Sequence, residues 1–152
     1  MDVTRRVCAK VLLIDPTDRV LLFSGIDRHL PEEPPVWFPV GGGVDPGETL
    51  EEAAIRETAE ETGFHLARPG APVLTRRFEW VFEGVRYDQE ETYFVVRVPT
   101  ITPVQDGWTE VEKATVQGHR WWTVAELRAT TEVVFPENLA DILAGFLESD
   151  SG

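Results

Sequence analysis

Residues 49–63 most constrain what this chain can fold into, because they carry both ends of a helix in one short segment. Thr49 is followed three residues later by Glu52, which is the spacing of a capping box at a helix N-terminus. Gly63 supplies a stop signal at the other end. The sequence therefore predicts a helix over residues 50–62, and the remaining elements must be arranged around it.

Three carboxylates share one face of this predicted helix at positions i, i+3 and i+4, namely Glu57, Glu60 and Glu61. Like charges at this spacing destabilise a helix, and acids in its last turn oppose the helix dipole. Such a conflict with local rules is typical of a functional site, although a solvated Glu-rich surface helix is the alternative. A hard divalent cation would supply the compensation. Mg²⁺ fits better than zinc, because no Cys or clustered His accompanies the acids.

Arg56 is the one basic residue within this acidic helix. Its planar guanidinium can reach Glu52 and Glu60 one turn away, lock Glu57 in place, or pair with Glu48 just before the helix. We therefore expect Arg56 to organise the acids.

Strand and helix signals alternate along the chain and predict a single domain over residues 1–152. Apolar and alternating runs predict strands at residues 7–15, 20–23, 74–82, 85–98 and 118–122. The strands 7–15 and 20–23 are expected to pair as one hairpin, and 74–82 and 85–98 as another. Loops are expected at residues 25–36, around the glycines 41–43 and at 99–110. A capping box at Thr123 opens a short helix, and an apolar stripe predicts a last helix from Pro136. The fold class is α/β (α+β), with a mixed, partly antiparallel sheet flanked by helices.

The net charge of −13, from 27 acidic and 14 basic residues, excludes several classes of partner. A protein that binds nucleic-acid phosphates needs a basic face, so neither long nucleic acid nor an anionic membrane is expected. Cys8 is the single cysteine, which excludes an intrachain disulfide and a Cys-based zinc site. The sequence shows no long apolar stretch and no signal peptide, so a cytoplasmic location is expected.

Residues 42–64 resemble the box of the Nudix hydrolase family, G-x5-E-x7-R-E-U-x-E-E-x-G-U, in which U is a bulky aliphatic residue. The fixed positions that match at the right spacing are Gly42, Glu48, Arg56, Glu57, Glu60, Glu61 and Gly63. Thr58 and Phe64 depart from the aliphatic positions, and Val40 stands where the family commonly has a proline directly before the glycines.

This resemblance implies a Nudix fold, an α/β/α sandwich, and a metal-dependent pyrophosphohydrolase. It implies that the three helix acids bind Mg²⁺ or Mn²⁺, that Arg56 orients a box glutamate, and that the Gly41 carbonyl is a further metal ligand. Gly42, Glu48 and Gly63 are structural positions of the box. Water attacks a phosphorus of a nucleoside diphosphate linked to another group, with Glu57 our first choice as general base.

Candidates outside the box are fewer. Many members of the family add an acid from a strand, and Glu91 is the first candidate for this additional base or ligand, ahead of Glu90. Trp37 can stack on a base or pack in the core. Arg76 can meet substrate phosphates or face solvent.

The substrate is a small nucleotide or nucleotide derivative, but its identity stays open. A nucleoside triphosphate, a nucleotide sugar and a dinucleotide are all compatible, whereas RNA 5′ ends are disfavoured by the charge. Subfamilies acting on ADP-ribose or dinucleoside polyphosphates often carry a Pro or Tyr beyond the box, where this chain has residues 78–81 with neither. A non-catalytic nucleotide-binding sensor and an isomerase on the same fold are the alternatives. A homodimer is compatible with the resemblance.

Overall fold

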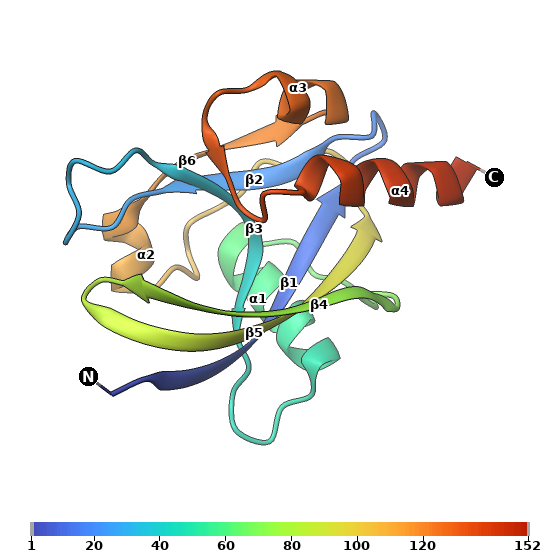
Figure 1. Cartoon of the computed structure of the whole chain (residues 1–152). Coiled ribbons are helices and arrows are strands. Elements are labelled where there is room, and N and C mark those ends of the chain that lie inside the picture. Colours follow the sequence, from blue (N-terminus) through green and yellow to red (C-terminus); the bar gives the residue numbers. More distant parts are fainter. Residues whose placement is uncertain (1, 152) are drawn as a thin grey trace.

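The computed structural model describes residues 2–151, in which seven strands form one mixed sheet (Figure 1). The strands are β1 (Thr4–Ile14), β2 (Val20–Gly25), β3 (Val36–Gly43), β4 (Pro72–Phe82), β5 (Val85–Arg97), β6 (Val116–Trp122) and β7 (Val133–Val134). The helices are α1 (Leu50–Thr62), α2 (Glu110–Thr115), α3 (Val124–Ala129) and α4 (Leu139–Ser151).

The sheet has the strand order β4-β5-β1-β2-β3-β7, and β6 pairs with β2. β1 runs parallel to β5 along its whole length, and β7 runs parallel to β3. The remaining pairings are antiparallel, including β1 with β3 and β4 with β5. The prediction of a mixed, partly antiparallel sheet is therefore confirmed.

Helices cover both faces of this sheet, so each face has its own hydrophobic core. Ala53 and Ala54 of α1 pack on one face with residues such as Val11 and Phe94. On the other face, buried residues of α3 and α4 pack against Leu12 and other strand residues. Figure 1 shows α1 apart from α3 and α4, as this layering requires. The predicted α/β/α arrangement is confirmed.

The α1 helix has the bounds that the sequence predicts, because its end signals are formed as expected. The Thr49 side chain accepts from the Glu52 backbone N–H, and Glu52 accepts from the Thr49 backbone N–H. Gly63 ends the helix in a left-handed conformation with φ of 82°. The predicted long hairpin is also present, closed by a tight turn at Glu83 and Gly84.

Several details differ from the prediction. The glycines 41–43 belong to β3 and not to a loop, because β1 pairs with them and satisfies their backbone groups. The short elements α2 and β7 were not predicted. The last helix begins at Leu139, since residues 136–138 form a preceding turn in which Leu139 N–H donates to the Pro136 carbonyl.

Within residues 2–151, no helix has both the length and the apolar character needed to cross a membrane.

Candidate active site

Arg56 lies at the centre of the acidic cluster on α1 and holds it together. Its Nε and Nη2 atoms donate to the two oxygens of Glu48, each at 2.8 Å, in a bidentate pair. Nη1 donates to Glu57 at 3.0 Å and to Glu60 at 3.1 Å, while Nη2 also donates to the Gly43 carbonyl at 2.8 Å. These contacts raise the pKa of Arg56, and they lower the pKa of Glu48 to about 2. The guanidinium therefore ties the loop before the helix to the helix itself.

The other helical partner considered for Arg56 has a different role. Glu52 lies one turn before Arg56, but its carboxylate is engaged in the capping box with Thr49. Arg56 donates hydrogen bonds to the carboxylates of Glu48, Glu57 and Glu60, and its Nε also lies 3.3 Å from the Asp45 carboxylate.

Gly42 explains how Glu57 fits against β3. A Cβ atom at Gly42 would lie 2.8 Å from the carboxylate carbon and from both oxygens of Glu57. Only a glycine leaves this space for the carboxylate. The Glu57 side chain is only 12% exposed, and burial raises its pKa in spite of the contact with Arg56.

Glu61 is the most deeply buried acid of the cluster. The residue is 5% exposed, and its carboxylate accepts one hydrogen bond, from the Gly41 backbone N–H at 2.8 Å. Burial raises its pKa well above the usual value, while the nearby Lys10 charge opposes this rise and the charge of Glu57 adds to it. Gly41 has φ of 134°, and a Cβ atom there would collide with the Ala9 carbonyl, so the position requires glycine.

The donor set of this cluster suits a hard divalent cation. It consists of carboxylate oxygens and the Gly41 carbonyl, and the space above Gly42 is kept free for a carboxylate. Burial raises the pKa of Glu57 and of Glu61. The positive charges nearby therefore do not fully offset the cost of burying the two ionised carboxylates. Glu60 is more open, with a side chain that is 42% exposed. Among residues 2–151 no three acidic, His or Cys side chains are already arranged to hold a metal ion, since Arg56 and Gly41 take up several of these oxygens.

The structure adds a residue that sequence reasoning missed. Glu112 of α2 lies close enough to the cluster for its charge to raise the pKa of both Glu57 and Glu61. The segment before it also covers α1, because Trp108 Nε1 donates to the Glu61 backbone carbonyl at 2.8 Å. A usable signal was present, since Thr109 and Glu112 have the spacing of a capping box and form one.

Glu91 lies on β5 in a buried row of polar side chains. It accepts from Gln89 Nε2 at 2.6 Å and from the Tyr93 hydroxyl at 2.5 Å, while Trp80 Nε1 donates to Gln89 at 2.9 Å. The charges of Glu91 and Glu57 both act on Cys8, whose pKa is raised first of all by burial. Its partner Tyr93 belongs to the core on the α3 and α4 side of the sheet, and no hydrogen bond within residues 2–151 joins Glu91 to the α1 acids. Its neighbour Glu90 faces the other way and is contacted by Arg5 at 3.5 Å.

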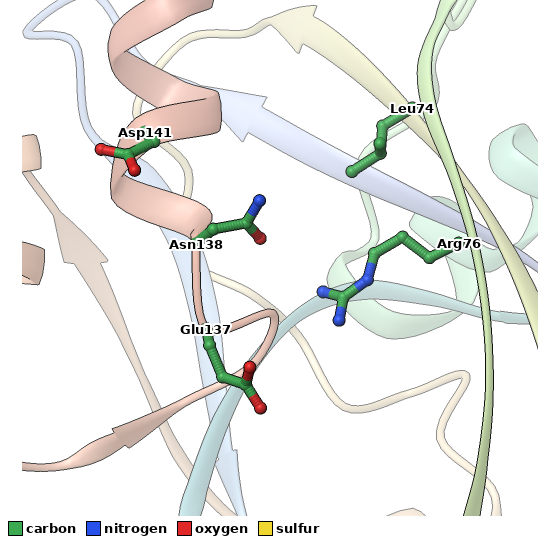
Figure 2. A pocket seen from close by; sticks show the side chains of 5 residues that line it. All are labelled: Leu74, Arg76, Glu137, Asn138 and Asp141. Atoms are coloured by element: carbon green, nitrogen blue, oxygen red, sulfur yellow. The ribbon is translucent and has the colours of Figure 1, made fainter.

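Arg76 lines a cavity of about 480 Å³ between β4 and the start of α4. Figure 2 shows its guanidinium directed from β4 toward Glu137 and Asn138. The Nη1 atom is buried and has no hydrogen-bond partner within the described residues. The guanidinium carbon lies 4.9 Å from the centre of the Phe135 ring. The lining of the cavity thus combines a cationic side chain with an amide and with carboxylates.

Trp37 packs mainly as a core residue on the α4 side of the sheet. Its ring lies 5.2 Å from the Trp122 ring at a near-perpendicular angle, and its Nε1 donates to Glu132. The backbone carbonyl of Trp37 also accepts from the Phe135 N–H, and the Phe135 ring contacts the Arg76 guanidinium. The structure therefore places Trp37 on the face of the sheet that α3 and α4 cover, and the α1 helix packs on the other face.

Comparisons with known proteins agree with this geometry. The NUDIX domain family model matches residues 4–143. An RNA pyrophosphohydrolase of Erythrobacter litoralis (strain HTCC2594) is 36% identical over 106 residues, and the match covers 63% of each chain. The chain spans between 35% and 63% of the length of the first curated relatives that it matches.

Solved structures show the same fold at low sequence identity. The NUDIX hydrolase from Nitrosomonas europaea has a TM-score of 0.62 at 20% identity, over 97% of this chain and 90% of that one. The E. coli dihydroneopterin triphosphate pyrophosphohydrolase has a TM-score of 0.61 at 22% identity, over 97% of this chain and 99% of that one. Since the family model covers most of its residues, the chain belongs to the Nudix hydrolase family.

Proposed function

We propose that this protein hydrolyses a diphosphate linkage in a nucleoside diphosphate joined to another group, with Mg²⁺ as cofactor and Mn²⁺ as a substitute. The observation that carries this proposal is the cluster at α1 and β3. There Arg56 gathers Glu48, Glu57 and Glu60, while Glu61 is buried against Gly41 with a single hydrogen bond. Buried acids that outnumber the positive charges around them fit a cation site in a family whose members generally use divalent metal ions.

Each residue of the cluster has a distinct task in this proposal. Glu57, Glu60, Glu61 and the Gly41 carbonyl hold the metal, which when bound neutralises phosphate charge and lowers the pKa of a water. Arg56 fixes the orientation of Glu57 through the 3.0 Å hydrogen bond. Glu57 is also our first choice as general base, because the contact with Arg56 holds its carboxylate at the edge of the cluster.

Glu91 is proposed as an additional acid of the site. Its two short hydrogen bonds, from Gln89 and Tyr93, fix the carboxylate in one position. Cys8 of β1 is the register partner of Glu91 on one side and of Gly43, next to the Gly42 that Glu57 contacts, on the other. Glu91 can therefore help hold a metal or a water from the sheet side.

We assign the Arg76 cavity to the part of the substrate that lies away from the metal. Its volume of about 480 Å³ is in the range of sites for small molecules. The Arg76 guanidinium and the Asn138 amide line the cavity and carry donors for carbonyl or phosphate oxygens. Arg76→Met is expected to raise KM more than it lowers kcat, because the side chain binds without taking part in the reaction. An unchanged KM would remove Arg76 from the substrate site.

A small nucleotide is favoured over RNA, because the net charge of −13 opposes binding of a polyanion. The RNA pyrophosphohydrolase named among the relatives nevertheless makes a triphosphorylated RNA 5′ end the second candidate. The two candidates differ in salt dependence, since contacts to several backbone phosphates would make RNA binding fall steeply with added salt.

The direct test is phosphate release, after coupling to a phosphatase where needed, from a panel of substrates with Mg²⁺. The panel contains nucleoside triphosphates, nucleotide sugars, dinucleotides and a 5′-triphosphorylated RNA. Turnover is expected to disappear with EDTA and in Glu60→Gln. Glu51→Gln, which removes an exposed charge from the first turn of the same helix, is the matched control and should keep full activity.

Two outcomes would contradict the proposal. Activity that survives EDTA, or full activity in Glu60→Gln, would exclude the metal-dependent mechanism. Nucleotide binding measured by calorimetry without any turnover across the panel would instead favour the non-catalytic sensor.

A further inference from the structure

Lys10 is a buried lysine that the proposed reaction does not use. It lies on β1, is 9% exposed, and directs its Nζ to the Gly41 carbonyl at 3.5 Å, which is long for a hydrogen bond. The Nζ atom also lies 5.6 Å from the centre of the Phe38 ring. Within residues 2–151 Lys10 forms no salt bridge, although burying an ammonium group without a close anion is costly.

The pairing of β1 with β3 accounts for the position of Lys10. Lys10 is the register partner of Gly41, and a Cβ atom at Gly41 would lie 2.7 Å from the Lys10 Cα. The two backbones therefore meet without an intervening side chain, and the lysine extends along the edge of the acid cluster. Strand pairing, and not an ion pair, places the ammonium there.

The ammonium group contacts one group proposed to hold the metal, the Gly41 carbonyl, and acts electrostatically on a second, the Glu61 carboxylate, without forming an ion pair with it. Its positive charge opposes the effect of burial on the pKa of Glu61. The Glu61 carboxylate is in turn fixed by the Gly41 backbone N–H at 2.8 Å. Lys10, Gly41 and Glu61 thus form one unit in which a single positive charge faces a carbonyl and a buried carboxylate.

We propose that Lys10 is a positioning residue that holds the place of the divalent ion at Gly41 and Glu61 in the substrate-free protein. Its charge weakens the binding of a free divalent ion, because two cations at the same oxygens repel each other. The ion is then admitted most readily as a complex with the substrate, whose phosphates neutralise the added charge. This inference rests on the proposed function, since it assumes that the cluster is a metal site.

The test measures metal binding without turnover. Free Mn²⁺ is quantified by electron paramagnetic resonance during titration of the substrate-free protein, for the unaltered chain and for Lys10→Met. Lys10→Met is expected to bind Mn²⁺ at least tenfold more tightly, because the Coulomb repulsion between a unit charge and a dication a few ångströms apart is substantial even in water. Arg86→Met, which removes one positive charge from the exposed hairpin pair with Glu79, should bind Mn²⁺ like the unaltered chain.

A second variant separates charge from packing. Lys10→Gln keeps a donor for the Gly41 carbonyl but removes the charge, so it should also bind Mn²⁺ more tightly. If Lys10 had only a structural role, neither variant would bind Mn²⁺ more tightly than the unaltered chain. Equal or weaker Mn²⁺ binding by folded Lys10→Gln, checked by circular dichroism, would overturn the proposal. If the unaltered chain turns over substrates with Mg²⁺ while the variants show no gain, only the role of Lys10 fails. If it shows neither turnover nor Mn²⁺ binding, the proposed function fails as well.

Discussion

Asp15 and Glu61 are both buried carboxylates, yet the protein surrounds them in opposite ways. The Asp15 side chain accepts six hydrogen bonds, from Thr17, Arg19 and Thr100, and Arg19 contacts it with two guanidinium nitrogens. Burial alone would raise its pKa, but these contacts outweigh burial and lower the pKa to about 2. Glu61 accepts one hydrogen bond, and burial raises its pKa well above the usual value.

This difference separates a structural carboxylate from one that we propose as a metal ligand. Asp15 has its lone pairs satisfied and joins the turn after β1 to the segment that follows β5. Glu61 keeps unsatisfied acceptor capacity and lies among other acids, which costs stability in the absence of a cation. Burial of an acid is therefore not by itself a sign of function. Burial of an acid that accepts few hydrogen bonds is such a sign.

The comparison predicts that neutralising Glu61 removes activity without loss of stability. Glu61→Gln keeps the acceptor for the Gly41 N–H but removes the charge, so kcat should fall by about 10³-fold or more. The free energy of unfolding should stay equal or rise, because an under-paired buried charge is removed. Steady-state kinetics and urea denaturation at neutral pH measure the two effects, and a strongly destabilised variant would contradict this view of Glu61.

The opposite result is expected at Asp15. Asp15→Asn breaks the bidentate contact with Arg19 inside the protein, and the free energy of unfolding should fall by about 3 kcal/mol. The folded fraction should keep its kcat, because Asp15 contacts none of the α1 acids. Urea denaturation and kinetics below the unfolding transition test this, and a loss of kcat in the folded variant would show that the two carboxylates are linked.

The sequence revealed the site best where its contacts are local. The α1 helix, its caps and the spacing of its acids follow from residues within one or two turns, so all could be predicted. The glycine strand, in contrast, depends on pairing with β1, and the contact of Lys10 with Gly41 spans 31 residues. The bond from Thr100 to Asp15 spans 85 residues, and the Arg76 cavity joins β4 to α4. Such contacts arise only when the whole sheet is assembled.

Acid titration sharpens the comparison further, because the pKa of Asp15 is depressed in the folded state. Its value is about 2 when folded against 3.8 when unfolded, so the stabilisation is fully present above pH 3.8 and is lost as pH falls toward 2. The loss amounts to about 2 kcal/mol. Free energies of unfolding between pH 6 and pH 2 should therefore decline less steeply in Asp15→Asn than in the unaltered chain, and parallel curves would contradict the assignment.

The smallest effect is expected at Glu112, whose negative charge disfavours the ionised form of Glu61. The charge of Glu112 raises the pKa of Glu61 and Glu57 from a separate helix. Glu112→Gln should therefore raise the metal-free free energy of unfolding by about 0.5 kcal/mol and weaken Mn²⁺ binding about twofold, since a distant charge contributes little. Glu110→Gln on the same helix, with a side chain that is 93% exposed, should change neither quantity measurably. If both variants behave alike, the charges on α2 do not affect the site. The raised pKa of Glu61 then results from burial and from the acids of α1 alone.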